Sequence, residues 1–233
     1  MMAHTKLMYL SVFSGRSTYL LAALLALLCA YPFVLDATWQ HRLLLGSLNV
    51  AILVAAARAA TQTQRAFLLV VIFLALPSVG LQAAYLLTQN AAVGELLYLT
   101  YALFYLFTIA HVLRYVFDVG EVTTDKIYGA IAAYILVALL WASIYLLLEA
   151  LHPGSFASGA TGEAIKQIHM EDLLYFSFVT MTTTGYGDIA PATAHARSLA
   201  ILEQLAGTFY IAILIARLTG LYQGHRGHSS VGK

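Results

Sequence analysis

Long apolar runs, separated by short polar segments, dominate the pattern of this chain. A helix that crosses a bilayer needs about 20 apolar residues. Six runs approach or exceed that length, and the third contains Pro77, which predicts a kink because proline removes a helix hydrogen bond. The predicted spans are 17–35, 43–60, 66–88, 95–117, 127–149 and 197–222.

The segment between the last two predicted spans follows a different pattern. It is polar and rich in glycine at first, and then a short apolar stretch runs from 171 to 182. That stretch is too short to cross a bilayer. We expect a re-entrant helix that enters the membrane halfway, since irregular backbone at that depth is tolerated only where it is buried or lines water.

Composition supports a membrane protein independently of these runs. Hydrophobic residues make up 61% of the chain and charged residues 10%, whereas a soluble domain carries roughly 25% charged residues. The net charge of +1 gives no basis for nucleic-acid binding. Cys29 is the single cysteine, so no intrachain disulfide forms.

The distribution of basic residues predicts the orientation. With six spans and the N-terminus inside, nine basic residues fall on the cytoplasmic side and three outside. An alternative is that residues 1–30 form a cleaved signal peptide, because Leu20–Ala30 resembles a short apolar core of such a peptide. The apolar stretch continues to Leu35, however, and Arg16 lies far from the start of the chain, so we favour a span.

The most informative segment is Thr180-Met181-Thr182-Thr183-Thr184-Gly185-Tyr186-Gly187-Asp188, directly after the short apolar stretch. Its glycines allow backbone angles at which successive carbonyl groups point the same way. Four such loops around an axis replace the water shell of a potassium ion. The segment resembles the selectivity filter of potassium channels, whose usual form is Thr-Val/Ile-Gly-Tyr-Gly-Asp.

This resemblance covers about 127–222 and implies an all-α membrane protein with six transmembrane helices, and a re-entrant pore helix and filter loop between the last two. It implies K+ ligands at Thr183, Thr184, Gly185 and Tyr186, with Gly187 completing the filter. No other cofactor is expected. Because one motif per chain cannot close a ring of four, we expect a homotetramer in contact with membrane lipids.

Two departures from the family pattern lie near the filter. Tyr175 and Phe176 replace a common tryptophan pair of the pore helix, and Tyr175 is expected to reach Asp188. Thr184 stands where valine or isoleucine is usual, and its hydroxyl needs a partner, for which Thr180 or a backbone carbonyl is a candidate.

The last span carries further candidates. Gly207 is at the position of the family's inner-helix hinge, although close helix packing explains it equally well. Glu203 is an acid inside an apolar span, and we weigh a gating acid against a hydrogen-bonded structural role, favouring the latter. By resemblance, the cavity-lining residues are Thr208, Ile211 and Ile215.

The first four spans lack a voltage sensor. The fourth offers His111 and Arg114 near its inner end and no ladder of arginines above them, so steep voltage gating is not expected. The predicted organisation is a four-helix unit resembling a degenerate voltage sensor, a cytoplasmic linker, a pore domain and a short cytoplasmic tail. Their bounds are 1–117, 118–126, 127–222 and 223–233.

The leading hypothesis is passive, potassium-selective conduction in a prokaryotic plasma membrane, with both termini cytoplasmic. The alternatives are a weakly selective cation channel, a potassium transporter subunit, and a membrane sensor with a vestigial pore. Tyr186 argues against a weakly selective channel. A transporter subunit would need four pore segments in one chain, and the sequence contains one. The intact Thr183–Asp188 run argues against a vestigial pore. An enzyme is disfavoured, because no metal-ligand cluster or nucleophile–base pair is evident in the sequence.

Overall fold

The computed structural model describes residues 15–30, 50–52, 54–55, 65–118, 122–165 and 167–229. Side chains are described for these residues except 16, 65–71 and 218–229. In this part of the chain the fold is mostly helical. The elements are α2 (Arg16–Ala30), α4 (Arg65–Thr88), α5 (Ala91–Val116), α6 (Thr124–Leu151), β1 (Phe156–Ser158), α7 (Met170–Met181), β2 (Ile189–Pro191) and α8 (Ala194–Ser229).

Three of the described helices are long and apolar enough to cross a membrane: Ala91–Val116, Thr124–Leu151 and Ala194–Arg217. Two shorter apolar helices, Ser17–Ala30 and Ile72–Thr88, fall within the predicted first and third spans. The predicted span 43–60 and the second half of 17–35 lie mostly outside the described residues.

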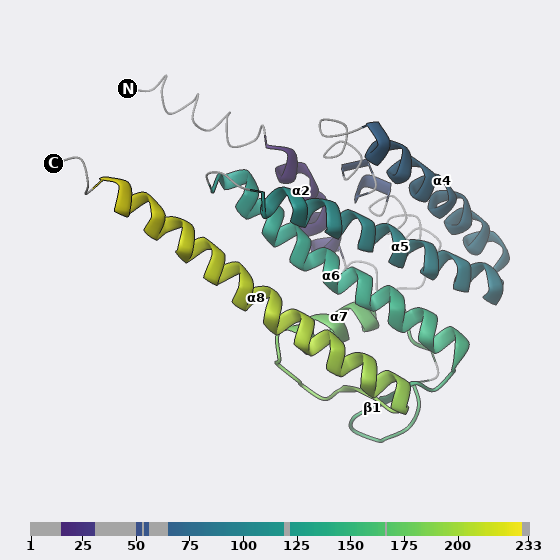
Figure 1. Cartoon of the computed structure of the whole chain (residues 1–233). Helices are drawn as coiled ribbons and strands as arrows, with labels where there is room; N and C mark the ends of the chain where they lie inside the picture. The colour runs from purple at the N-terminus through teal and green to yellow at the C-terminus, as the bar shows by residue number, and fades with distance from the viewer. Residues whose placement is uncertain are drawn as a thin grey trace.

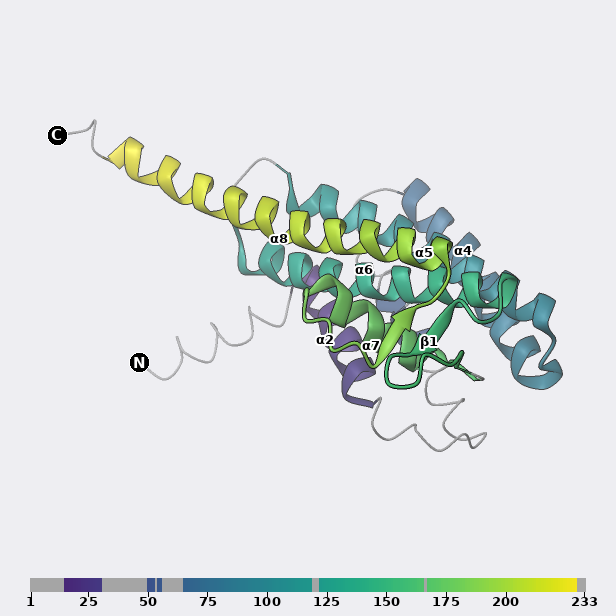
Figure 2. The ribbon, with the colours of Figure 1, turned by 90° about the horizontal axis from the view of Figure 1, so that it is seen from below.

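The helices run side by side, and α6 is central to the packing. In Figure 1, α4, α5 and α6 form one layer, while α8 lies alongside α6 and α7 sits beneath them. Figure 2 shows the same order from below, with α8 continuing beyond α6 toward the C-terminus. Most of the fully buried apolar residues belong to α5, α6 and α7, so the core lies between these helices.

A side chain at the start of α6 connects α2 to α5 and α6 by hydrogen bonds. The Asp125 carboxylate accepts hydrogen bonds from the Ser17 backbone N–H at 2.8 Å, the Ser17 hydroxyl at 3.3 Å and the Tyr115 hydroxyl at 2.8 Å. A carboxylate at the N-terminus of α2 satisfies an unpaired N–H and complements the helix dipole. Residues of three helices thus meet at one side chain.

Two helix bounds and a small sheet differ from the elements predicted from the sequence. The predicted linker 118–126 is shorter, because Thr123 caps α6 by accepting from the Lys126 backbone N–H, which places Asp125 and Lys126 in the first helical turn. The last helix does not stop at 222 but runs to Ser229. A small antiparallel sheet, β1 with β2, also lies within a region predicted to be irregular.

Replacing Asp125 with alanine is expected to lower the free energy of unfolding by about 1–2 kcal/mol, because the Ser17 N–H and the Tyr115 hydroxyl lose their acceptor. Thermal unfolding of the detergent-solubilised protein measures the loss. Asp125→Asn is the matched control, since its amide oxygen still accepts from Ser17, and it should lose less. Equal losses for the two variants would contradict this account.

Candidate functional site

The candidate site is built around α7 and the loop that follows it. Glu171 and Asp172 begin the helix, where acidic side chains suit the positive end of the helix dipole. The Asp172 carboxylate also accepts from the His169 backbone N–H at 2.9 Å, which fixes the first turn. The helix ends at Met181, and the loop 182–188 follows directly.

Along this loop, residues with a positive φ angle alternate with residues that do not have one. Thr183, Gly185 and Gly187 have positive φ angles of 58°, 61° and 78°, while Thr184 and Tyr186 between them are not among the residues with positive φ. Alternating left-handed and right-handed residues place successive N–H groups on one side, which leaves the carbonyl groups on the other. Thr183 is the non-glycine residue that adopts this conformation, which costs it free energy.

A short set of backbone bonds anchors the start of the loop. The N–H groups of Thr183, Thr184 and Gly185 turn back to the last turn of α7, with bonds to the carbonyls of Thr180 and Val179. The end of the loop beyond Gly185 is held by contacts with β1 and the residue that follows it. Gly159 donates its N–H to the Asp188 carbonyl at 2.9 Å, and β1 pairs with β2 just after the loop. The loop is therefore fixed at both ends.

The two aromatic residues of α7 have different surroundings. Phe176 is buried in an edge-to-face trio with Tyr145 and Phe156, whose ring centroids lie 5.3–5.4 Å apart. Tyr175 is 40% exposed and stacks on Tyr186, with centroids 6.5 Å apart and an interplanar angle of 1°. Its hydroxyl also interacts with the Asp188 carboxylate.

The Thr184 hydroxyl has a partner that the sequence analysis did not name. Thr182 donates its hydroxyl proton to the Phe178 carbonyl at 2.7 Å, and the Thr182 and Thr184 hydroxyl oxygens lie 2.8 Å apart. Since Thr182 has one proton, Thr184 is the donor in that contact. Thr180, the expected partner, instead supplies its backbone carbonyl to Thr183. The spacing of two residues between Thr182 and Thr184 was the signal in the sequence that could have indicated this pair.

Glu203 is buried where α6, α7 and α8 meet. Its side chain is 0% exposed, and it contacts the Ser177 hydroxyl and the Tyr145 hydroxyl, the latter at 2.5 Å. The Ser177 oxygen also lies 3.1 Å from the Ala138 carbonyl. The single hydroxyl proton of Ser177 cannot be donated fully to both the Glu203 carboxyl oxygen and the Ala138 carbonyl oxygen. When Glu203 is neutral and donates to Ser177, the hydroxyls of Ser177 and Tyr145 and the Glu203 carboxyl group all have hydrogen-bond partners. Glu203 is thus hydrogen-bonded to side chains of both α6 and α7.

Gly207 lies one helical turn beyond Glu203 and touches the end of α7. A β-carbon at this position would stand 2.7 Å from the Met181 carbonyl oxygen and 3.0 Å from its α-carbon. Backbone atoms cannot move aside as a flexible side chain does, so close packing alone requires glycine here. The structure therefore provides a specific reason for the packing interpretation of Gly207.

The remaining predicted residues lie on a different face of α8. Glu203, Gly207, Tyr210 and Leu214 form the stripe that packs on the same chain. Thr208, Ile211 and Ile215 fall outside this stripe and are exposed in the single chain. The structure therefore brings together the loop, its supports and Glu203 but leaves these three residues apart from them.

Replacing Glu203 with alanine is expected to lower the free energy of unfolding by about 2–4 kcal/mol, because two buried hydroxyls lose a partner and a cavity forms. Glu203→Gln should keep most of the stability, since its amide can donate to Ser177 and accept from Tyr145. Thermal unfolding in detergent compares the two, with replacement of the exposed Gln167 by alanine as control. A Gln variant as unstable as the Ala variant would show that the bonding requires an ionised carboxylate.

Comparison with known proteins agrees with this geometry. A family model described as ion channel matches residues 133–223, which include α7, the loop and most of α6 and α8. The chain is 31% identical over 104 residues to a voltage-gated potassium channel from Aeropyrum pernix, covering 45% of this chain and 28% of that protein. It is 34% identical over 84 residues to two pore potassium channel c from Oryza sativa, covering 36% and 18% respectively.

A smaller relative is covered more fully. Protein LctB from Geobacillus stearothermophilus is 31% identical over 98 residues, which make up 42% of this chain and 72% of that protein. The chain thus spans less than a third of the two potassium channels that it matches. No solved structure is significantly similar to it. The matching family consists of ion channels and not of enzymes, and on these similarities the chain belongs to the potassium channel family.

Proposed function

We propose that the protein is a subunit of a potassium-selective channel in which four identical chains surround a central pore. The observation that carries this proposal is the loop 183–187, whose φ angles alternate in sign directly after α7. Such a loop offers several carbonyl oxygens on one side, and oxygens are the ligands that replace the hydration shell of K+. In this proposal Thr183, Thr184, Gly185, Tyr186 and Gly187 form the filter, and K+ binds at the first four.

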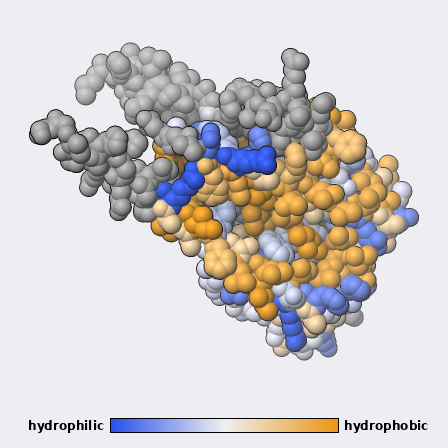
Figure 3. Space-filling view, viewed as in Figure 1, coloured by the Kyte–Doolittle hydropathy of each residue, from blue (hydrophilic) through white to orange (hydrophobic). Residues whose placement is uncertain are grey.

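The surface of α8 supports the tetramer. In the window of α8 that is hydrophobic enough to cross a membrane, 11% of the residues are buried, against 50% and 56% in α5 and α6. Hydrophobic residues also cover much of the described part of the face seen in Figure 3. The large apolar side chains exposed on α8 are Ile201, Leu202, Leu205, Phe209, Ile211, Ile213 and Ile215. Copies of the chain arranged around the axis cover part of this surface, and lipid covers the rest.

A hollow beside the loop supports the same assembly. It is lined by residues of α7, the loop and α8, including Thr180, Thr183, Gly185 and Gln204, and has a volume of about 360 Å³. A water-filled hollow of this size next to a filter would leave it poorly supported. A neighbouring subunit packed into it supplies the missing contacts.

The membrane arrangement follows from the same proposal. The chain crosses the membrane six times, α7 is the re-entrant pore helix, and both termini are cytoplasmic in a prokaryotic plasma membrane. Thr208, Ile211 and Ile215 line the cavity below the filter. The basic residue of α5 is Arg114 in its last turn, and each gating charge contributes about 2.3 kcal/mol per 100 mV. The channel is therefore not steeply voltage-gated.

The reversal potential tests this function. Purified protein in planar bilayers, with K+ on one side and Na+ on the other, is expected to reverse near the potassium equilibrium potential. The open probability should change little with voltage. A reversal near zero would indicate a weakly selective cation pore, and no current from a correctly assembled tetramer would favour a sensor with a vestigial pore.

Thr184→Val is expected to shorten the mean open time by roughly fivefold at an unchanged reversal potential, because the filter loses one hydrogen bond of about 1 kcal/mol to Thr182. Single-channel recording measures both quantities. Thr184→Ser keeps the hydroxyl and is the matched control. Open times of the valine variant equal to those of the unmodified protein would show that the Thr182–Thr184 contact does not brace the filter.

A further inference from the structure

Strand β1 leads directly to the last residues of the loop 182–188. Gly159, the residue that follows β1, donates its N–H to the Asp188 carbonyl at 2.9 Å. A β-carbon on Gly159 would overlap the Gly187 carbonyl oxygen, and it would lie 2.7 Å from the carbonyl carbon and 3.5 Å from the Asp188 nitrogen. Gly159 therefore lies against the peptide unit that joins Gly187 to Asp188.

Gly159 is needed for this close approach and not for its own backbone angles. The described glycines with positive φ are Gly154, Gly162, Gly185 and Gly187, and Gly159 is not among them. Other residue types could therefore adopt its conformation, but their β-carbon would collide with the loop. The colliding atoms are backbone atoms, which cannot turn aside as a flexible side chain does.

Strand β1 is itself firmly attached to the rest of the chain. Phe156, its first residue, is 0% exposed and belongs to the aromatic trio behind α7. Just before the strand, the Glu149 carboxylate accepts from the N–H groups of Gly154 and Ser155 at 2.7 Å and 2.9 Å, which connects this segment to the end of α6. The strand thus forms a fixed wall beside the Gly187–Asp188 peptide unit.

Gly187 is a residue at which such a wall matters. It has a φ angle of 78° and no side chain, so the peptide units on both sides of it rotate at low cost. The preceding unit carries the Tyr186 carbonyl, and the two units share the Gly187 α-carbon. A rotation of one unit therefore displaces the other. Contact with Gly159 restricts the second unit, and through it the direction of the Tyr186 carbonyl.

We propose that Gly159 is a positioning residue for K+ binding, and that it acts on the Tyr186 carbonyl through the Gly187–Asp188 peptide unit. This role rests on the proposed function, in which Tyr186 supplies the K+ ligand nearest the outside. Ion binding by a filter depends on the number and direction of its carbonyl dipoles. A side chain at position 159 weakens the outer K+ site, whereas the inner sites persist because Thr183 and Thr184 are anchored separately by the end of α7.

Single-channel recording of Gly159→Ala in planar bilayers tests this role. The conductance is measured while external K+ is varied at fixed internal K+, and then the reverse. Half-saturating external K+ should rise about fivefold, as for the loss of one contact comparable in strength to a hydrogen bond. Half-saturating internal K+ and the reversal potential should stay unchanged, which a general weakening of the structure would not produce.

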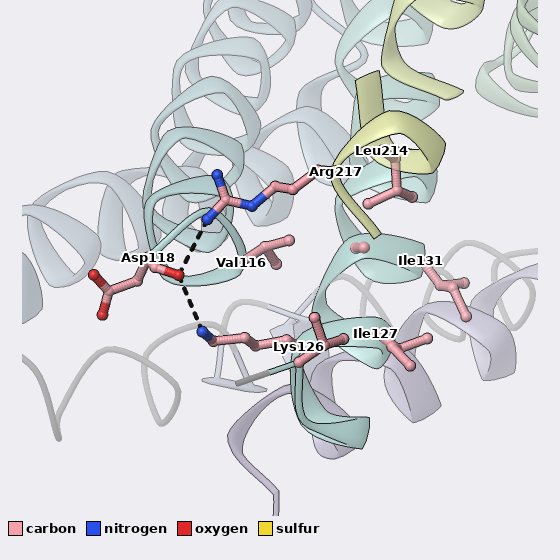
Figure 4. A pocket seen from close by; sticks show the side chains of 9 residues that line it. Val116, Asp118, Lys126, Ile127, Ile131, Leu214 and Arg217 are labelled. Atoms are coloured by element: carbon pink, nitrogen blue, oxygen red, sulfur yellow. Dashed lines mark hydrogen bonds between the residues drawn. The ribbon is translucent and has the colours of Figure 1, made fainter. Parts of the chain in front are cut away.

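Two control variants accompany this measurement. Ala160→Ser is the matched control, because it adds a single heavy atom to the exposed residue next to Gly159. Ile131→Ala controls for lost stability. Ile131 lines a groove with Leu214 and Arg217 of α8, near the start of α6 and at the opposite end of that helix from β1 (Figure 4). It should lower the melting temperature without changing half-saturating external K+.

Three results would overturn the role of Gly159. They are an unchanged external half-saturation in Gly159→Ala, equal shifts on the two sides of the membrane, and an equal effect of Ala160→Ser. If Gly159→Ala fails to assemble, Phe156→Leu takes its place, because it loosens the attachment of β1. This variant should shift the external half-saturation in the same direction, and an unchanged value would again overturn the role.

Hydrogen exchange measures the contact without conduction. In Gly159→Ala, the backbone N–H groups of 183–190 should exchange faster than in the unmodified protein, because the end of the loop loses its support. If the unmodified protein is not K+-selective, the proposed function fails, and faster exchange still supports the positioning of the peptide unit. If it is K+-selective and neither exchange nor the external half-saturation changes, only the role of Gly159 fails.

Discussion

The position of the loop 183–187 depends on α7 being held rigidly, and the hydrogen bonds around Glu203 hold that helix. The loop 183–187 is neither helix nor strand, so it has few bonds of its own and takes its position from its two ends. Ser177 in α7 contacts Glu203 in α8 and the Ala138 carbonyl in α6, while Tyr145 in α6 bonds the same carboxyl group. A buried polar set of this kind stabilises one geometry when every member is paired and is costly when one is not.

Apolar packing extends the support on both sides of this set. Tyr145 also belongs to the aromatic trio with Phe156 and Phe176, so one side chain connects the polar set to β1 and to the back of α7. On the other side, Gly207 brings α8 into backbone contact with Met181, the last residue of α7. The first half of α8 is thus attached to α7 by a hydrogen bond and by steric fit.

Much of the helical architecture could be predicted from the sequence, because apolar runs and the length of a bilayer crossing determine where helices begin and end. The short helix 171–182 and the fourth and fifth spans agree with α7, α5 and α6 within a few residues, and the last span agrees with the start of α8 but not with its end. The sheet β1–β2 escaped prediction because three-residue strands carry no periodic signal. The partners of Thr184 and Glu203 escaped because they depend on which faces of helices meet, a tertiary property. At Gly207 the sequence left two explanations, and the short distance to Met181 adds a steric reason for the packing one.

These contacts also restrict how α8 can move. A bend centred on Gly207 would drive the helix into the Met181 backbone or open a gap beside the buried Glu203, and both are costly in a packed interior. Beyond Gly207, the contacts of α8 with the same chain include the Tyr210 hydroxyl, which donates to the Ala130 carbonyl at 2.6 Å, and the Arg217 guanidinium, which bonds the carbonyls at the end of α5. Motion of the lower helix therefore has to pass through the α5–α6–α8 contacts. Asp125 attaches α2 and α5 to the start of α6 at the same level, so a change in α2 is transmitted directly to α6.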